Sequence, residues 1–259
     1  DMDEAVAERL EEITVDVDTV EVTELADELA AAKTRPLPST KGERVAAGRF
    51  DYSSSLSVQG NEMEMEVERR IAHSEEEGRK LLEITSTTSS AMGSGSDRFV
   101  LDADSLRPVR REAEQGPATI SVEFGRDAVT GEINANGQQM PIEIDLDAPA
   151  FGGEAALEVA ILGLPLSEDY SHPLRFAEVG MQQRVRYFRL DVDGRETVNV
   201  PAGEFEAWRI DLSALDDEGG DLTLWVSADA PRKVLRAEGK LPAAMGGGEY
   251  TTVLTATGE

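Results

Sequence analysis

The chain has 259 residues, no cysteine and a formal charge of −27, from 52 acidic and 25 basic side chains. The absence of thiols excludes a disulfide framework, a cysteine-ligated zinc and a thiol nucleophile, and the strong negative charge disfavours binding to nucleic acid or to an anionic membrane. No run of about 18 apolar residues occurs, so the sequence predicts no transmembrane segment.

The distribution of charge carries further information. The acidic residues are spread along the whole chain, and the basic residues are five lysines and twenty arginines. This pattern is typical of proteins that work in high salt, where ions screen self-repulsion; the alternative is an acidic protein that also folds in low salt. Because the chain begins with Asp1 and not with Met, we also expect that an export leader has been removed. The predicted location is extracytoplasmic, in the periplasm or the outer envelope.

The first part of the chain differs from the remainder. Apolar residues recur at helical spacing near its start, a short strand is predicted over 13–17, and a second helix is predicted to begin at Thr23. Two prolines in the next ten residues predict a linker. The expected organisation is a helical and mixed appendage (1–33), a linker (34–43) and one domain (44–259).

From residue 44 onward, apolar and polar side chains alternate at every second position. Phe50 and Tyr52 share one face of the first such run, and Arg49 and Asp51 share the other. Strands with one apolar and one charged face belong to an antiparallel sheet that packs on one side only. Turn chemistry separates the later runs, and the predicted turns include Asp193-Gly194, Ala202-Gly203, Gly219-Gly220 and Gly246-Gly247-Gly248.

One segment, 153–164, breaks the alternation. It is apolar on nearly all sides, with Glu154 and Glu158 as its charges, and Gly163 and Pro165 end it. A helix that is apolar all round must be covered by other parts of the protein. We therefore expect a mainly β fold, in which a large curved antiparallel sheet, an open or half barrel, wraps around this helix.

Four strings along the chain carry a resemblance to a known family. They are Phe99–Arg110, Leu162–Leu166, Val198–Trp208 and Leu224–Arg232, and the strings V-P-A-G-x-F-x-A-W and L-W-V-S-x-D-x-P-R within them are the most specific. In this order they resemble the bacterial envelope family catalogued as domain of unknown function 3108, over roughly residues 44–256. The resemblance implies an exported protein with a half-barrel similar to the periplasmic outer-membrane lipoprotein carrier, in which a curved sheet and a helix enclose an apolar cavity. It implies no catalytic residue.

The sequence contains little that indicates catalysis or metal binding. Asp169, Ser171 and His172 lie close together, but neighbouring residues of an extended chain point to opposite faces and Pro173 follows, so we expect a turn and not a triad. A zinc site without cysteine would need both histidines, His73 and His172, together with carboxylates. We expect no catalytic residue, no metal and no cofactor.

Acidic pairs at D-x-D spacing recur, as at Asp191 and Asp193. A calcium loop needs several oxygens on one turn and a glycine at a set position. We interpret the pairs as hairpin turns and chance in a very acidic chain. Carboxylate pairs also serve in glycoside hydrolases, and this alternative stays open.

A ligand site is predicted where the helix and the sheet meet. Leu157 and Ile161 lie on one face of the predicted helix, and the two tryptophans, Trp208 and Trp225, lie on predicted strands, with Trp225 in opposite phase to its apolar neighbours. These four side chains are the candidate lining of an apolar cavity. The alternative is that they pack in the core or on the surface without contacting a ligand.

Three functions follow from these features. The first is an exported, non-enzymatic protein that binds a lipid, an acyl chain or a hydrophobic peptide segment in the half barrel. The second is a structural or interaction domain of the cell envelope, with a filled interior and a protein partner. The third is a hydrolase that uses carboxylates. The expected partners are thus a hydrophobic ligand or an envelope protein, with no prediction of the oligomeric state.

Overall fold

The computed structural model describes residues 19–180, 182–216, 219–241 and 247–258. The helix and the strand predicted within the first 18 residues lie outside this part of the chain. The described residues form fifteen β-strands, two α-helices and one 3-10 turn. The mainly β fold class is confirmed.

The first eight strands are β1 (Gly48–Val58), β2 (Asn61–Glu76), β3 (Arg79–Ser90), β4 (Gly93–Asp102), β5 (Pro108–Gln115), β6 (Ala118–Phe124), β7 (Ala128–Ala135) and β8 (Gln138–Asp145). The other seven are β9 (Phe151–Gly152), β10 (Ser171–Val179), β11 (Gln183–Val200), β12 (Gly203–Ala214), β13 (Leu222–Ser227), β14 (Val234–Lys240) and β15 (Glu249–Gly258). The helices are α2 (Thr19–Thr34) and α3 (Ala155–Leu162), and the 3-10 turn η1 is Gly42–Arg44.

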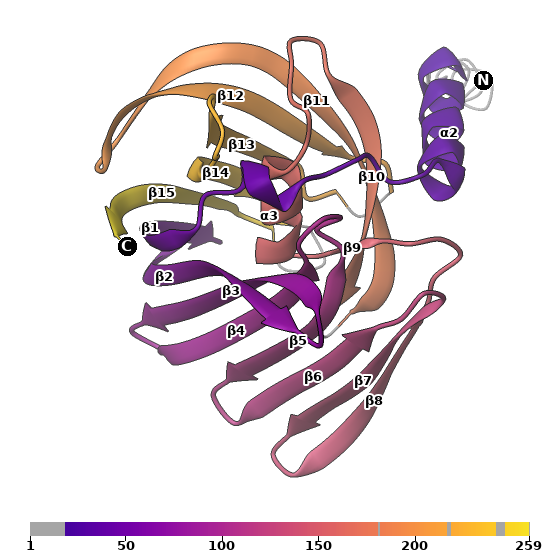
Figure 1. Cartoon of the computed structure of the whole chain (residues 1–259), viewed down its shortest axis with the longest axis vertical. Coiled ribbons are helices and arrows are strands. Elements are labelled where there is room, and N and C mark those ends of the chain that lie inside the picture. The colour runs from indigo at the N-terminus through magenta and orange to yellow at the C-terminus, as the bar shows by residue number, and fades with distance from the viewer. Residues whose placement is uncertain (1–18, 181, 217–218, 242–246, 259) are drawn as a thin grey trace, which may run out of the picture.

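The described strands all belong to one sheet, in the order β8-β7-β6-β5-β4-β3-β2-β1-β15-β14-β13-β12-β11-β10-β9. Apart from β8 and β9, strands that follow each other in the chain are neighbours in the sheet, and β1 pairs antiparallel with β15 to join the first and last strands. From the β1–β15 pair, the strands run in chain order to β8 on one side and in reverse chain order to β9 on the other. The sheet is therefore open between β8 and β9. This confirms the predicted open, curved sheet (Figure 1).

The two ends of the sheet overlap instead of meeting edge to edge. Neighbouring residues of β10 point to opposite faces, and both faces are buried. Phe176 packs in the main core, whereas Ala177 and Val179 belong to a second cluster with Val122 and Ile142 on the inner face of β6–β8. The end of β10 thus packs against the concave face of β6–β8. One end of the sheet lies inside the other, so the half barrel forms a roll.

Helix α3 fills the interior of this roll (Figure 1). Seven of its eight side chains are buried, and the eighth, Glu158, lies in its first turn. The helix contacts β3, β4 and β9. The predicted apolar helix is confirmed, with slightly shorter bounds, and so is its enclosure by the sheet.

Two arginines hold the carboxyl end of α3. The last carbonyl groups of a helix have no partner within the helix. Arg232 donates hydrogen bonds to the carbonyl oxygens of Leu162 (3.0 Å) and Leu164 (2.9 Å), and Arg44 donates to that of Gly163 (2.9 Å). Positive charges here also match the negative end of the helix dipole. Arg232 ends one of the strings that carry the family resemblance, and its role is to anchor the central helix.

Helix α2 packs on the outside of the roll, beside β10 and β11 (Figure 1). Arg175 of β10 is buried and donates to the carbonyl oxygens of Ala32 (2.8 Å) and Arg35 (2.7 Å) at the end of the helix. The helix begins at Thr19, before the predicted start at Thr23. The predicted boundaries of the appendage and the linker stay predictions.

The predicted turn at Asp193-Gly194 is wrong. Strand β11 continues through these residues, and its register with β12 shifts between Val192 and Gly194, which makes a β-bulge. Gly194 has φ of 129°, a conformation that side chains rarely adopt, so the glycine serves a bulge and not a hairpin. The predicted turn at Ala202-Gly203 is confirmed, since it connects β11 to β12.

Candidate functional site

A groove of about 1130 Å³ lies on the concave face of the sheet. Its walls are β2, β3, β4 and β5, the start of α3 and Tyr250 of β15. Helix α3 covers the inner part of this face and leaves the outer halves of the strands open. The two ends of the groove differ in chemistry.

Three methionines line the outer end, beside small and polar residues of β3 and β4. Met63, Met65 and Val67 alternate with glutamates along β2 and therefore point to the same face. Met92, in the turn between β3 and β4, is 80% exposed and lines the same groove. Methionine is flexible and polarisable, so this end is an adaptable apolar surface.

The inner end is charged. Arg111 of β5 donates from Nη2 to Asp97 Oδ2 (2.6 Å) and to Glu154 Oε2 (2.7 Å), and from Nε to Asp97 Oδ1 (3.1 Å). Its Nη1 donates to the carbonyl oxygen of Val179 (2.8 Å). The guanidinium also lies 4.9 Å from the ring centroid of Phe99. Each nitrogen of Arg111 thus has a protein partner.

A second ion pair joins the helix to the sheet. Arg69 Nη1 of β2 donates to Glu158 Oε2 of α3 (2.5 Å), and its guanidinium lies 5.3 Å from the ring centroid of Tyr52. Glu154 is the residue before α3 and Glu158 lies in the first turn of the helix, and both side chains line the groove. Carboxylates at this end also match the positive end of the helix dipole.

Glu154 is the member of this cluster that opens to the groove. Its side chain is 58% exposed, compared with 2% for Arg111. Desolvation by the surrounding protein at the inner end of the groove raises its pKa to about 7, against the opposing effect of Arg111, and the Asp97 carboxylate adds to the rise. Water in the groove still reaches the carboxylate. In the cluster as a whole, two guanidinium groups, of Arg69 and Arg111, face three carboxylates, which leaves an excess of negative charge.

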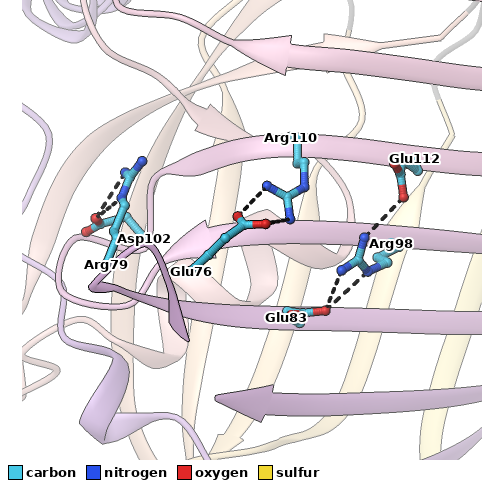
Figure 2. Close-up of polar contacts among 7 residues, drawn as sticks. All are labelled: Glu76, Arg79, Glu83, Arg98, Asp102, Arg110 and Glu112. Carbon is cyan, nitrogen blue, oxygen red and sulfur yellow. Dashed lines mark hydrogen bonds and ion pairs between the residues drawn. The ribbon is translucent and has the colours of Figure 1, made fainter. Parts of the chain in front are cut away.

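The outer face of the same strands carries partly exposed arginine–carboxylate pairs (Figure 2). Arg98 of β4 donates to Glu83 of β3 (2.7 Å) and to Glu112 of β5 (3.1 Å), and Arg110 of β5 donates to Glu76 of β2 (2.8 Å). Exposed pairs of this kind contribute little stability each. The expected adaptation to high salt stays a prediction, which a salt titration followed by circular dichroism tests.

Replacing Glu154 by glutamine is expected to raise the melting temperature at pH 8 and to leave it nearly unchanged at pH 5. A carboxyl group whose pKa is raised on folding costs stability as the pH rises from its ordinary pKa of 4.5 through the folded value of about 7. Glutamine stays neutral and avoids this cost. Thermal unfolding followed by circular dichroism at both pH values measures the difference.

Glu76→Gln on the outer face is the matched control, and its expected change in melting temperature has the opposite sign. The hydrogen bond from Arg110 lowers the pKa of Glu76, so its contribution is present at neutral pH and is lost as the pH falls. This variant is expected to lower the melting temperature slightly at pH 8. If Glu154→Gln did the same, the environment assigned to Glu154 would be wrong.

The structure places the four predicted ligand contacts away from this groove. Leu157, Ile161 and Trp208 are buried in the main core, and the indole N–H of Trp208 donates to a backbone carbonyl oxygen at 3.2 Å. Trp225 packs against Arg236, whose guanidinium lies 5.0 Å from the ring centroid. None of the four lines the groove. Their role as ligand contacts stays a prediction.

Sequence reasoning missed the charged residues of the groove. Arg69 lies between Val67 and Ile71 at same-face spacing, so the sequence itself places a charge on the apolar face of β2. Such a residue needs a partner when it is buried. The sequence therefore indicates that Arg69 needs a partner. It does not indicate that the partner lies on a helix far along the chain.

The other candidate chemistries gain no support from the structure. Ser171 and His172 begin β10, and His172 Nδ1 lies 2.7 Å from the carbonyl oxygen of Pro173. Within the described residues, no group of three or more His, Cys, Asp or Glu side chains is placed to hold a metal ion. In the same part of the chain, no helix has the length and apolar character needed to cross a membrane.

The fold and the groove define a class, an open barrel-like β-sheet rolled around an apolar helix. The model of the family described as "Protein of unknown function (DUF3108)" matches residues 51–253. The chain belongs to this family, as the sequence strings predicted.

One solved structure shows a similar fold. A β-barrel-like protein of the domain of unknown function DUF1849, from Brucella abortus, aligns with a TM-score of 0.53 at 9% identity, over 85% of this chain and 99% of that chain. A protein with a YmcC-like fold from Bacteroides fragilis aligns with a TM-score of 0.38 at 13% identity, over 86% of this chain and 98% of that chain. No curated protein matches the chain.

Proposed function

We propose that this is an exported, non-enzymatic protein that binds a lipid, an acyl chain or a hydrophobic peptide segment in the groove. The observation that carries the proposal is the methionine-lined outer end of a groove of about 1130 Å³. Ligand pockets in proteins commonly have volumes of roughly 300–1,000 Å³, so the groove has room for a ligand of that size. Flexible methionines suit apolar ligands of varied shape.

The ligand is expected in the groove and not between α3 and the sheet. The buried side chains of α3 fill the space in which the sequence predicted a cavity. A flexible chain would instead lie along β2, over Met63, Met65 and Val67, where the apolar face of the sheet continues beyond the helix.

The filled interior favours a second function, a structural or interaction domain of the cell envelope without a ligand. In that case the methionine surface would contact a partner protein. The two functions differ in one measurable respect, because only the first requires that a small apolar molecule binds to the isolated protein.

The test is binding of N-phenyl-1-naphthylamine, a neutral fluorescent amphiphile, to protein purified without detergent. We expect saturable binding, and mass spectrometry of an organic extract is expected to find a co-purified lipid or fatty acid. Met65→Glu, which places a charge at the outer end of the groove, is expected to weaken probe binding by at least about tenfold.

Met140→Glu is the matched control, since Met140 is an exposed methionine that does not line the groove. This variant is expected to bind the probe like the unmodified protein. Absence of both probe binding and extracted lipid would reject the ligand-binding function and leave the structural one.

A further inference from the structure

The charges of the groove indicate what kind of head group its ligand carries. This inference rests on the proposed function. Met63, Met65, Val67 and Arg69 lie on one face of β2, and six residues of a strand span about 20 Å. An amphiphile whose tail lies over the methionines would therefore bring its polar head to the charged inner end.

The inner end presents acceptors to a ligand. Among the described residues, the lining includes one arginine, Arg69, and four carboxylates, Asp97, Glu114, Glu154 and Glu158. A head group that enters here meets an excess of negative charge at short range, in addition to the charge of −27 of the whole chain.

The arginines of the cluster have little to offer an anionic head group. Arg111 is 2% exposed, and all three of its nitrogens donate to protein oxygens. Arg69 is also largely buried, and its Nη1 donates to Glu158. The Glu154 carboxylate, by contrast, opens to the groove.

We propose that the groove selects amphiphiles with a cationic, hydrogen-bond-donating head, such as a primary ammonium, and that Glu154 accepts the hydrogen bonds of that head. An ammonium group next to Glu154 compensates the excess negative charge of the cluster, and charge-assisted hydrogen bonds are stronger than neutral ones. An anionic head of the same size adds a like charge beside carboxylates, which is unfavourable.

The proton is a competitor for the same carboxylate. The charged groups that act on Glu154 are Asp97 on β4 and Arg111 on β5. The pair of Arg69 on β2 and Glu158 in the first turn of α3 lines the same groove. Because desolvation by the surrounding cluster raises the pKa of Glu154 to about 7, its carboxylate is mostly ionised at pH 8 and mostly protonated at pH 5.5. An alkylamine stays charged at both pH values, so its binding weakens as the pH falls.

The experiment is displacement of N-phenyl-1-naphthylamine by dodecylamine, dodecanoate and dodecyl maltoside at pH 8 in 0.15 M salt. We expect dodecylamine to displace the probe at a concentration at least about tenfold lower than dodecanoate, as expected for one charge-assisted contact. Butylamine, which lacks the tail, is expected to displace nothing. At pH 5.5 the advantage of dodecylamine is expected to shrink.

Two variants with the same net charge separate a local contact from general attraction to an acidic protein. Glu154→Gln is expected to reduce the preference for dodecylamine to less than about threefold. Glu132→Gln, an exposed position on β7 outside the groove, is expected to keep it. Equal loss in both variants would overturn the role of Glu154.

The outcomes also separate this inference from the proposed function. Equal displacement by all three twelve-carbon amphiphiles, or a preference for dodecanoate, overturns the head-group selection and leaves the ligand-binding function intact. No displacement by any of them, with no probe binding, rejects both.

Discussion

Arg111→Met is expected to lower the free energy of unfolding by about 3 kcal/mol, toward the lower end of the range for removing one partner of a buried ion pair. The substitution leaves Asp97 and Glu154 facing each other without the guanidinium that lies between them. It also removes the hydrogen bond to the carbonyl oxygen of Val179, near the overlap of the two sheet ends. The loss stays near the lower end because Glu154 reaches the water of the groove. Urea unfolding at pH 8, followed by circular dichroism, measures the change.

Arg110→Met is the matched control for this prediction. Arg110 is the neighbouring residue on β5, also paired with a glutamate, but it points to the outer face, where water screens the pair (Figure 2). Its replacement is expected to cost far less stability. The double variant Arg111→Met with Asp97→Asn is expected to recover part of the loss, because one of the two uncompensated carboxylates is removed. Equal losses for the two arginines would contradict the burial of the cluster.

Ile161→Ala is expected to lower the free energy of unfolding by about 2–5 kcal/mol. Ile161 of α3 is fully buried in the main core, so the substitution leaves a cavity that the surrounding strands cannot fill completely. Leu25→Ala on α2 is the control, since Leu25 is 45% exposed, and it is expected to change stability by less than about 0.5 kcal/mol. Urea unfolding compares the two variants.

The same variant tests the predicted role of Ile161 in ligand binding. If Ile161 belongs to the core alone, N-phenyl-1-naphthylamine binds the folded variant as it binds the unmodified protein. If Ile161 contacts the ligand, probe binding to the folded variant weakens. The packing of α3 in the core favours the first result.

Much of the fold was predictable because it depends on local patterns. Alternation along β1 and β2 follows from the pleat of a strand, which places every second side chain on one face. The apolar segment that becomes α3 had to be covered, and the sheet is the surface that covers it. The β-bulge at Asp193-Gly194 was not predictable in this way, because an aspartate–glycine pair suits a hairpin turn and a bulge alike.

The candidate site was only partly predictable. The apolar positions on β2 and the misplaced charge of Arg69 are visible in the sequence, since they follow from alternation within one strand. The partners of that charge are not visible in the sequence. Arg69 and Glu158 are 89 residues apart, and Arg111 and Glu154 are 43 residues apart, so no local pattern relates them.

The sequence by itself determined that this protein is very acidic and mainly antiparallel β-sheet, with one buried helix, because alternation, turn chemistry and charge are properties of neighbouring residues. Only the tertiary structure decided where the open space lies. The roll of the sheet brings β2, β4, β5 and the start of α3 together, and the packing of the helix closes the interior and leaves the groove outside it. Which side chains meet across such distances depends on the global path of the chain. For this reason the residues predicted to line a cavity lie in the core, and the charged groove was found only in the structure.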